Sequence, residues 1–144
     1  MSDYVPSPTE WVRTQVEQIE QTGTTESVDI QGRPVMLLTM RGAKSGAVRK
    51  VPVMRVEHAG VYCAVASKGG APEDPQWAAN LRAHPEVTVQ DGTQVHEVRA
   101  RLADDSEREQ WWPRCVEAFP DYGEYERKTD AVGRTIPLFL LEPR

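Results

Sequence analysis

The sequence lacks any apolar run near the ~18 residues that a membrane-spanning helix requires. Its N-terminus also lacks the basic segment and apolar segment of a secretory signal, so we expect a cytoplasmic protein. Cysteine and histidine are scarce, with two and three copies. Cys63 and Cys115 have no C-x-x-C or metal-ligand spacing, and we interpret them as buried thiols. His58, His84 and His96 fit no ligand spacing either, so no metal site is expected.

The 144 residues, 39% hydrophobic and 27% charged, are typical of one globular domain. We expect a single domain over 1–144, with an N-terminal helix and loop over 1–27 and the core over 28–144. The net charge of −5 argues against nucleic-acid binding. However, the segment 33–68 carries +6 while the remainder carries −11. This local positive charge favours a compact anionic ligand over a long polyanion.

The N-terminal segment predicts a helix from about Pro8 to Gln21. Ser7-Pro8-Thr9-Glu10 has the pattern of a capping box, and apolar residues then recur at helical spacing. We expect Trp11 and Val12 to face the core. The alternative that this helix touches a membrane or a partner stays open.

A series of short apolar or alternating segments follows, separated by turn residues such as Gln31-Gly32 and Asp91-Gly92. Pro52 lies inside one of them and predicts an edge strand or a bulge. The expected strands are 28–30, 35–40, 48–57, 61–67, 87–90, 94–102 and 136–141.

Two further helices are expected, one near 75–84 and a longer one near 105–119. Asp74 can cap the first, before Pro75. Pro113 is interior to the second and should kink it if the helix begins near Ser106, or is tolerable if it begins near Gln110. One more turn is expected over 122–127. The pattern predicts an α+β domain with a closed or half-closed antiparallel barrel of six to seven strands.

Two motifs carry the candidate chemistry. Gly42 to Pro52 (GAKSGAVRKVP) combines turn-forming glycines with three cations and a hydroxyl, which suits a phosphate or carboxylate ligand. A solvated turn is the alternative, and a phosphate-binding P-loop is excluded because its pattern is not matched. Ala66 to Pro72 (ASKGGAP) offers another tight turn and further donors. Downstream, Trp77 and Asn80 share one helix face.

These motifs resemble the deazaflavin-dependent nitroreductase family. The resemblance rests on RGAKSGxxRxxP at Arg41 to Pro52, on ASKGGxPxxPxWxxNL at Ala66 to Leu81, and on the late WP…FPxYxxY at Trp112 to Tyr125. It implies a split β-barrel that binds coenzyme F420, an 8-hydroxy-5-deazaflavin with a phosphate-linked polyglutamate tail. It further implies hydride transfer from F420H2 to a quinone, enone or nitroaromatic acceptor.

The resemblance also assigns residues to roles. The implied cofactor-binding residues are Ala43, Lys44, Ser45, Arg49, Lys50, Val51, Pro52, Val53, Met54, Val65, Ala66, Ser67, Lys68, Gln76, Trp77 and Asn80. The implied acceptor-binding residues are Met54, Trp77, Phe119, Tyr122 and Tyr125. Ser67 or Tyr122 would orient the acceptor, and Tyr122 or water would give the proton. Ala43 departs from the Arg or Lys of many relatives, which removes one tail contact.

Other readings stay open at this point. A split-barrel protein of this kind can bind a deazaflavin, or another anionic small molecule, without catalysis. An enzyme of this fold can also use FMN instead of F420. Homodimer formation and a peripheral position at the inner face of the membrane are likewise left open.

Overall fold

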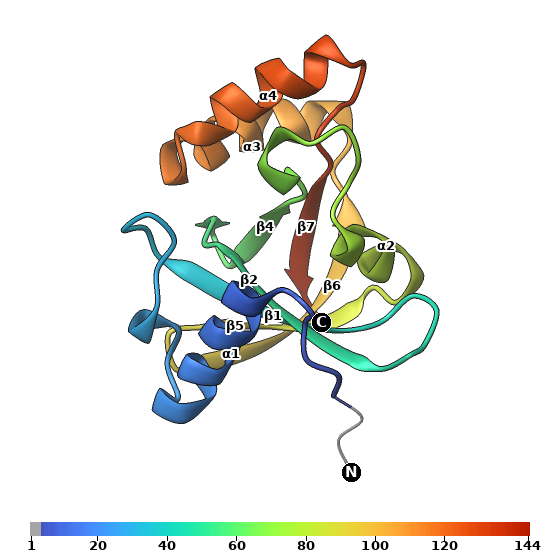
Figure 1. The fold of residues 1–144 in the computed structure, drawn as a ribbon. Helices are drawn as coiled ribbons and strands as arrows, with labels where there is room; N and C mark the ends of the chain where they lie inside the picture. The colour runs from blue at the N-terminus through green and yellow to red at the C-terminus, as the bar shows by residue number, and fades with distance from the viewer. Residues whose placement is uncertain (1–3) are drawn as a thin grey trace.

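The computed structural model describes residues 4–144, so residues 1–3 of the expected domain lie outside the described part. Seven antiparallel strands form one curled sheet in the order β2-β1-β5-β6-β7-β4-β3 (Figure 1). The strands are β1 (Val35–Arg41), β2 (Val48–Met54), β3 (Glu57–His58), β4 (Val61–Val65), β5 (Glu86–Asp91), β6 (Gln94–Leu102) and β7 (Leu138–Pro143).

The sheet curls at β6, which pairs with a different neighbour along each part of its length. Residues 94–99 of β6 pair with β5, and residues 98–102 pair with β7. In consequence β2 and β4 come into contact although four strands separate them in the sheet order. This half-closed barrel in an α+β chain confirms the expected fold class. Pro52 lies on β2 at the edge of the sheet, as its missing N–H group predicts.

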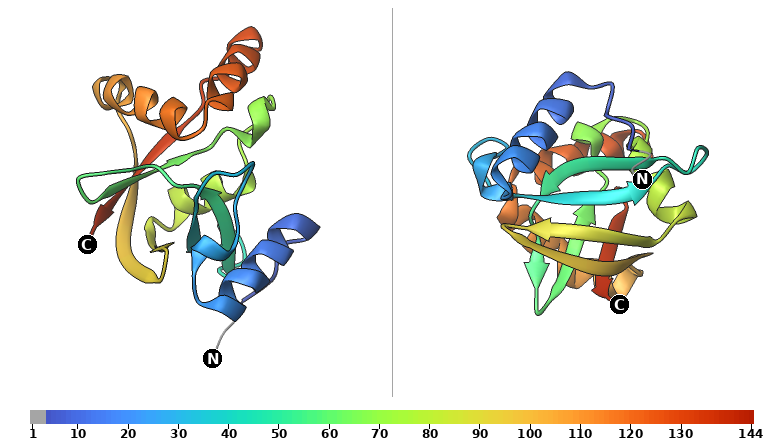
Figure 2. Two further views of the ribbon diagram at one scale, coloured as in Figure 1. Left: turned by 90° about the vertical axis from the view of Figure 1, so that its left-hand side faces the viewer. Right: turned by 90° about the horizontal axis from the view of Figure 1, so that it is seen from below.

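Four α-helices surround the sheet: α1 (Glu10–Thr22), α2 (Gln76–Ala83), α3 (Asp105–Ala118) and α4 (Asp121–Ala131). Two short 3-10 turns, η1 (Thr25–Ser27) and η2 (Lys68–Gly70), complete the elements. Helices α3 and α4 lie at one end of the molecule and α1 at the other (Figures 1 and 2). The cavity described below lies between these two ends.

Buried apolar residues form three clusters that correspond to this arrangement. One fills the barrel interior, where Val98 and Ala100 of β6 alternate with exposed neighbours as the two-residue period of a strand requires. A second lies between β4, β7 and the pair α3–α4. The third joins Val12, Val16 and Ile19 of α1 to Leu37 of β1. Helix α1 is therefore held to the sheet by an apolar face, whose residues recur every three to four positions.

Two strand predictions need correction. Residues 28–30 form no strand, only an isolated bridge between Ile30 and Arg33 that closes a tight turn. Gln31 and Gly32 both have positive φ in that turn, and the preceding residues enter it from η1. The segment 48–57 divides into β2 and β3, because the chain leaves one edge of the sheet and joins the other.

The helix ends also differ from expectation. Helix α1 begins at Glu10 after Thr9, which makes no side-chain cap, so the predicted capping box at Ser7 is wrong. A full capping box occurs instead at Asp104 and Glu107 of α3. Helix α3 begins at Asp105 and continues through Pro113 to Ala118.

Further along the chain, α4 is a helix of 11 residues, not a single turn. The predicted cap Asp74 does not cap α2; its carboxylate accepts hydrogen bonds from two arginines. Within residues 4–144, no helix is both long and apolar enough to cross a bilayer.

Candidate active site

A cavity of about 540 Å³ opens between α1, the strands β2 and β4, the turn η2, and helices α2 and α4. Its volume lies in the range typical of small-molecule sites. Several of its lining residues were expected from the sequence: Arg49, Lys50, Val51, Pro52, Val53, Met54, Val65, Ser67, Lys68, Gln76, Trp77, Asn80, Phe119, Tyr122 and Tyr125. Ala43, Lys44, Ser45 and Ala66 were also expected but are not part of the lining.

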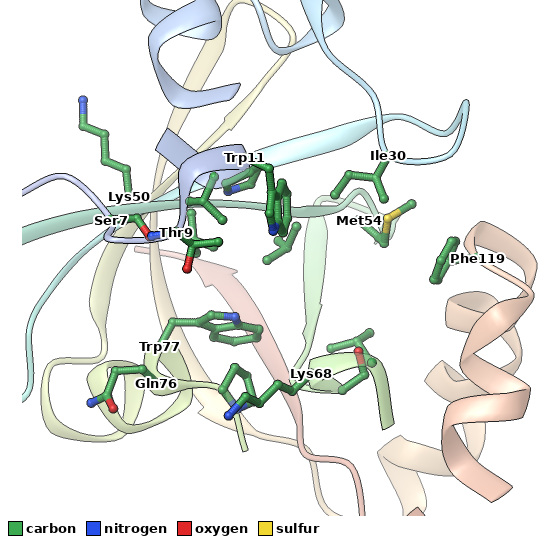
Figure 3. Close-up of a pocket in the computed structure, with 18 of the residues that line it drawn as sticks. Ser7, Thr9, Trp11, Ile30, Lys50, Met54, Lys68, Gln76, Trp77 and Phe119 are labelled. Carbon is green, nitrogen blue, oxygen red and sulfur yellow. The ribbon is translucent and has the colours of Figure 1, made fainter. Parts of the chain in front are cut away.

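One wall of the cavity comes from the N-terminal helix α1, which the sequence did not predict to be part of the site. Trp11 is 52% exposed and lines the cavity, so the expectation that it faces the core is wrong. Its neighbour Val12 is buried as expected and touches the cavity rim. Figure 3 shows Trp11 and Trp77 on opposite sides of the cavity. The helical period places Val12, Val16 and Ile19 inward, which leaves Trp11 beside the buried stripe. This position beside the stripe was the one sequence signal that Trp11 does not face the core.

The cavity has two chemically different sides. Lys50, Ser7 and Gln76 lie at one side in Figure 3, while Ile30, Met54 and Phe119 lie at the other. The first side is polar and cationic, and the Lys50 ammonium extends from it away from the cavity towards Glu20 (Figure 3). The second is apolar and aromatic, and Tyr122 and Tyr125 of α4 add to it. A ligand with a flat apolar body and an anionic extension would match this distribution.

The cations of the 33–68 segment do not form one site. Arg33 donates to the carbonyl oxygen of Ala118 at 3.1 Å, and Arg55 pairs with Asp91 at 2.8 Å, so both serve the fold. Lys50 and Lys68 reach the cavity lining, yet each already has an acidic partner. The charge asymmetry of the sequence therefore overstated the number of cations available to a ligand.

Lys50 pairs with Glu20 at 3.2 Å and Lys68 pairs with Glu73 at 2.9 Å. By contrast, Lys44 and Arg49 form no ion pair with any residue in 4–144. Among these residues, no carboxylate paired with Arg49 would compete with an incoming anion at the cavity wall. At Lys68 it would displace a carboxylate.

In the turn between β1 and β2, residues 42–47, several backbone N–H groups are already hydrogen-bonded within the protein. The Ala47 N–H donates to the Ser45 hydroxyl at 3.1 Å, and the Ala43 N–H donates to Asn80 Oδ1 at 2.9 Å. Asn80 is 5% exposed, so this amide is fixed between α2 and the turn. Asn80 thus holds the turn that presents Lys44, in addition to lining the cavity.

The second motif forms the 66–71 turn, built on an unusual backbone. Lys68, Gly69 and Gly70 have φ of 50°, 65° and 83° in succession. A left-handed conformation is ordinary for glycine but costs a residue with Cβ roughly 1–2 kcal/mol. Lys68 therefore holds a strained conformation that directs its side chain along the cavity (Figure 3). Gly70 is buried.

The aromatic side of the cavity is organised around Tyr122. Its ring packs edge-on against Phe119, with centroids 5.0 Å apart, and lies 6.1 Å from the Tyr125 ring. Tyr122 is only 4% exposed, and this burial raises the pKa of its phenol well above the ordinary value. The phenol therefore stays protonated at neutral pH. It can donate a hydrogen bond, but as an acid it is weak.

The two cysteines lie outside this chemistry. Both are fully buried free thiols. The sulfur atom of Cys115 on α3 lies 3.7 Å from that of Cys63 on β4. The neighbouring thiol and burial raise the pKa of Cys63. Neither cysteine lines the cavity.

The sequence profile of a family described as "F420H(2)-dependent quinone reductase" matches residues 11–143. This chain belongs to that family. A Mycobacterium tuberculosis (strain H37Rv) protein named as a candidate F420H(2)-dependent quinone reductase is 36% identical over 111 residues. The alignment covers 77% of this chain and 91% of the relative.

Solved structures agree with this assignment. A structure titled as an F420-H2 dependent reductase is 51% identical, with a TM-score of 0.71, and the match covers 80% of this chain and 99% of that one. A structure titled as a domain-swapped dimer is 52% identical, with a TM-score of 0.73, and the match covers 94% and 100%. The family confirms the cofactor class and the reductase class expected from the sequence motifs. Cations at one side, apolar strand residues along the floor and an indole on each face are a donor set that fits a deazaflavin with an anionic tail.

Proposed function

We propose that this protein reduces quinones by transferring a hydride from F420H2, and that enones and nitroaromatics are alternative acceptors. The observation that carries the proposal is the two-sided cavity, cationic at one side and aromatic at the other. Reduced F420, when bound, supplies a hydride, since its ring passes electrons in pairs. The residues of this chain supply binding, orientation and the exclusion of water.

The cationic side would hold the phosphate and glutamate tail. Arg49 and Lys50 on β2 line that side, and Lys68 reaches it from the 66–71 turn. Lys44 and Ser45, beyond the lining, would meet the more distant glutamates. Arginine offers two donors in a fixed plane and lysine a mobile charge, and both suit phosphate and carboxylate groups.

The strands would carry the ring. Val51, Val53 and Met54 of β2 and Val65 of β4 form an apolar surface, and Trp77 is held over it by packing against Phe139, with ring centroids 6.2 Å apart. Trp11 closes the other face. An indole on each side would leave a planar ring little freedom to tilt, which favours productive alignment.

The acceptor would bind at the aromatic side, among Met54, Phe119, Tyr122 and Tyr125. We assign Tyr122 and Ser67 to orient its carbonyl by hydrogen bonding. Because burial raises the pKa of Tyr122, water is the better source of the proton that completes the reduction. The raised pKa still favours Tyr122 as a hydrogen-bond donor.

The test combines binding with turnover. Fluorescence titration with F420 should show binding that weakens with salt and with Lys44→Ala or Lys68→Ala. Arg99→Gln, an exposed change on β6 outside the cavity lining, serves as the control and should bind normally. Oxidation of F420H2 by a soluble naphthoquinone should then be followed by the return of F420 absorbance.

Two outcomes would overturn the proposal in different ways. Tight F420H2 binding without oxidation by any quinone, enone or nitro compound would indicate a carrier or sensor. Micromolar binding of FMN together with no binding of F420 would indicate a different cofactor. Replacing Tyr122 by Phe without loss of turnover would exclude an obligatory role for its hydroxyl.

We further infer a homodimer, supported by the similar structure titled as a domain-swapped dimer. Light scattering after size-exclusion chromatography tests it, and a monomer at every concentration would refute it. A peripheral membrane position has less support, because the exposed surface of α1 carries Glu10, Glu17 and Glu20. Vesicle sedimentation would test it.

A further inference from the structure

Arg134 follows α4 and makes a set of contacts that neither the sequence motifs nor the cavity lining explain. Its side chain is only 9% exposed. It does not line the cavity. Its guanidinium nevertheless reaches the 66–71 turn, more than 60 residues earlier in the chain, which carries Ser67 and Lys68 of the proposed cofactor site.

The guanidinium donates hydrogen bonds to three carbonyl groups of this turn. Nη1 donates to the carbonyl oxygens of Ser67 at 2.9 Å and Ala71 at 2.6 Å, and Nη2 donates to that of Ala66. Nε donates to the Asp74 carboxylate at 3.0 Å. Asp74 also accepts from Arg82 of α2 at 3.3 Å, so the network continues into the helix that carries Trp77.

The turn needs such support. Three successive residues with positive φ, one of them Lys68, draw its carbonyl groups away from regular backbone pairing. Within the turn only two backbone hydrogen bonds form, from Gly70 to Ser67 and from Ala71 to Lys68. A planar cation with several donors can hold carbonyl groups that point to one spot, which a lysine ammonium cannot do with the same geometry.

Helix α4 also touches the turn directly. A Cβ placed on Gly70 would lie 3.1 Å from Tyr125 Cα and 3.0 Å from the Lys128 side chain, so the turn lies against the helix backbone. Helix α4 carries Tyr122 and Tyr125 of the acceptor side. The cofactor turn and the acceptor wall are thus joined twice, at Gly70 and at Arg134.

We propose that Arg134 is a positioning residue that fixes the 66–71 turn and links it to α4, so that cofactor and acceptor sides keep one relative position. The proposed role of Arg134 rests on the proposed function only for the identity of the ligand. The ordering of the turn is a property of the chain itself.

The experiment measures hydrogen exchange of the protein without cofactor and F420 affinity by fluorescence. In Arg134→Ala, peptides covering 66–74 and 121–131 should exchange faster, while β5 and β6 keep their protection. F420 binding should weaken roughly tenfold, about the effect of losing one well-placed charged hydrogen bond. Arg127→Ala is the matched control, since Arg127 is an exposed α4 arginine whose one ion pair within residues 4–144 is with Glu124 of the same helix. It should change neither readout.

Two further variants keep the test valid if Arg134→Ala folds poorly. Arg134→Lys keeps the charge but not the planar set of donors, so it should show the same faster local exchange as Arg134→Ala. Added guanidinium ion should partly restore F420 binding to Arg134→Ala relative to the same concentration of NaCl. Gly70→Ala pushes the turn off α4 with all charges intact and should show the same local pattern. A uniform loss of protection across the sheet, or normal F420 affinity with normal exchange at 66–74, would overturn the assignment. If the wild-type protein does not bind F420, the proposed function fails, whereas the exchange result still decides the role of Arg134.

Discussion

Asn80 offers the sharpest test of how the 42–47 turn, proposed to meet the anionic tail of the cofactor, is held. Its Oδ1 accepts the Ala43 N–H at 2.9 Å, and its side chain is 5% exposed. In Asn80→Ala this acceptor is lost. Ala43 is only half-buried, so water can reach its N–H, and the loss should cost about 1 kcal/mol, the low end for a broken hydrogen bond.

Stability should change little, because alanine is the better helix former. Its propensity offsets up to ~0.7 kcal/mol of that cost within α2. The net effect is roughly 0.5 kcal/mol, or about 1–2 °C in Tm for a chain of this size. Binding responds differently, since the turn 42–47 must be ordered again when the anion binds. The same ~1 kcal/mol then corresponds to about fivefold weaker F420 binding.

The conservative variant separates positioning from direct contact. Asn80→Asp keeps an acceptor for the Ala43 N–H but adds a negative charge beside the anion site. It should leave amide exchange at Ala43 slow, and its weaker F420 binding should recover relative to wild type as salt rises. In Asn80→Ala the Ala43 amide should exchange faster at every salt concentration. Normal Ala43 exchange in Asn80→Ala combined with weak F420 binding would refute this reasoning and indicate that Asn80 contacts the cofactor.

Three further predictions follow from charge and burial. Glu73→Gln should tighten F420 binding at low salt, because it frees Lys68 from its 2.9 Å ion pair, and fluorescence titration showing weaker binding would contradict this. Burial raises the pKa of Tyr122, so its contribution to stability is present below the unfolded value of about 10 and is lost as pH rises towards the native pKa. Urea unfolding of Tyr122→Phe should therefore show a smaller fall in stability above pH 10 than wild type. Cys63 and Cys115 should resist a thiol reagent such as DTNB until the protein unfolds, and rapid native labelling would show that the core opens there.

Several features could be predicted because they depend on local chemistry. The edge position of Pro52 follows from its missing N–H, and the glycine turns follow from the positive φ that glycine alone adopts freely. Most strands were recognised from their apolar alternation. The sequence also identified the two motifs that supply Arg49 to Pro52 and Ser67 to Gly69 to the cavity lining.

Other features depended on partners that are distant in the chain. No local pattern shows that Glu20 and Glu73 occupy Lys50 and Lys68, or that Arg33 and Arg55 serve the fold. Trp11 was misassigned because helical periodicity identifies a buried stripe, yet cannot show that a residue beside the stripe faces a cavity.

The sequence by itself determined the class of site. Turn glycines and clustered cations indicate an anion site, because charge and backbone freedom are properties of the residues themselves, and the resemblance of the motifs to the family implies that the anion is a deazaflavin tail. Only the tertiary structure decided which groups are available to it. Curling of the sheet brings β2 against β4, and folding places Asn80 and Arg134 under turns 37 and more than 60 residues away. Burial and pairing are set by such distant neighbours, so the same cation can bind a ligand, oppose a carboxylate or hold a turn according to what the fold brings beside it.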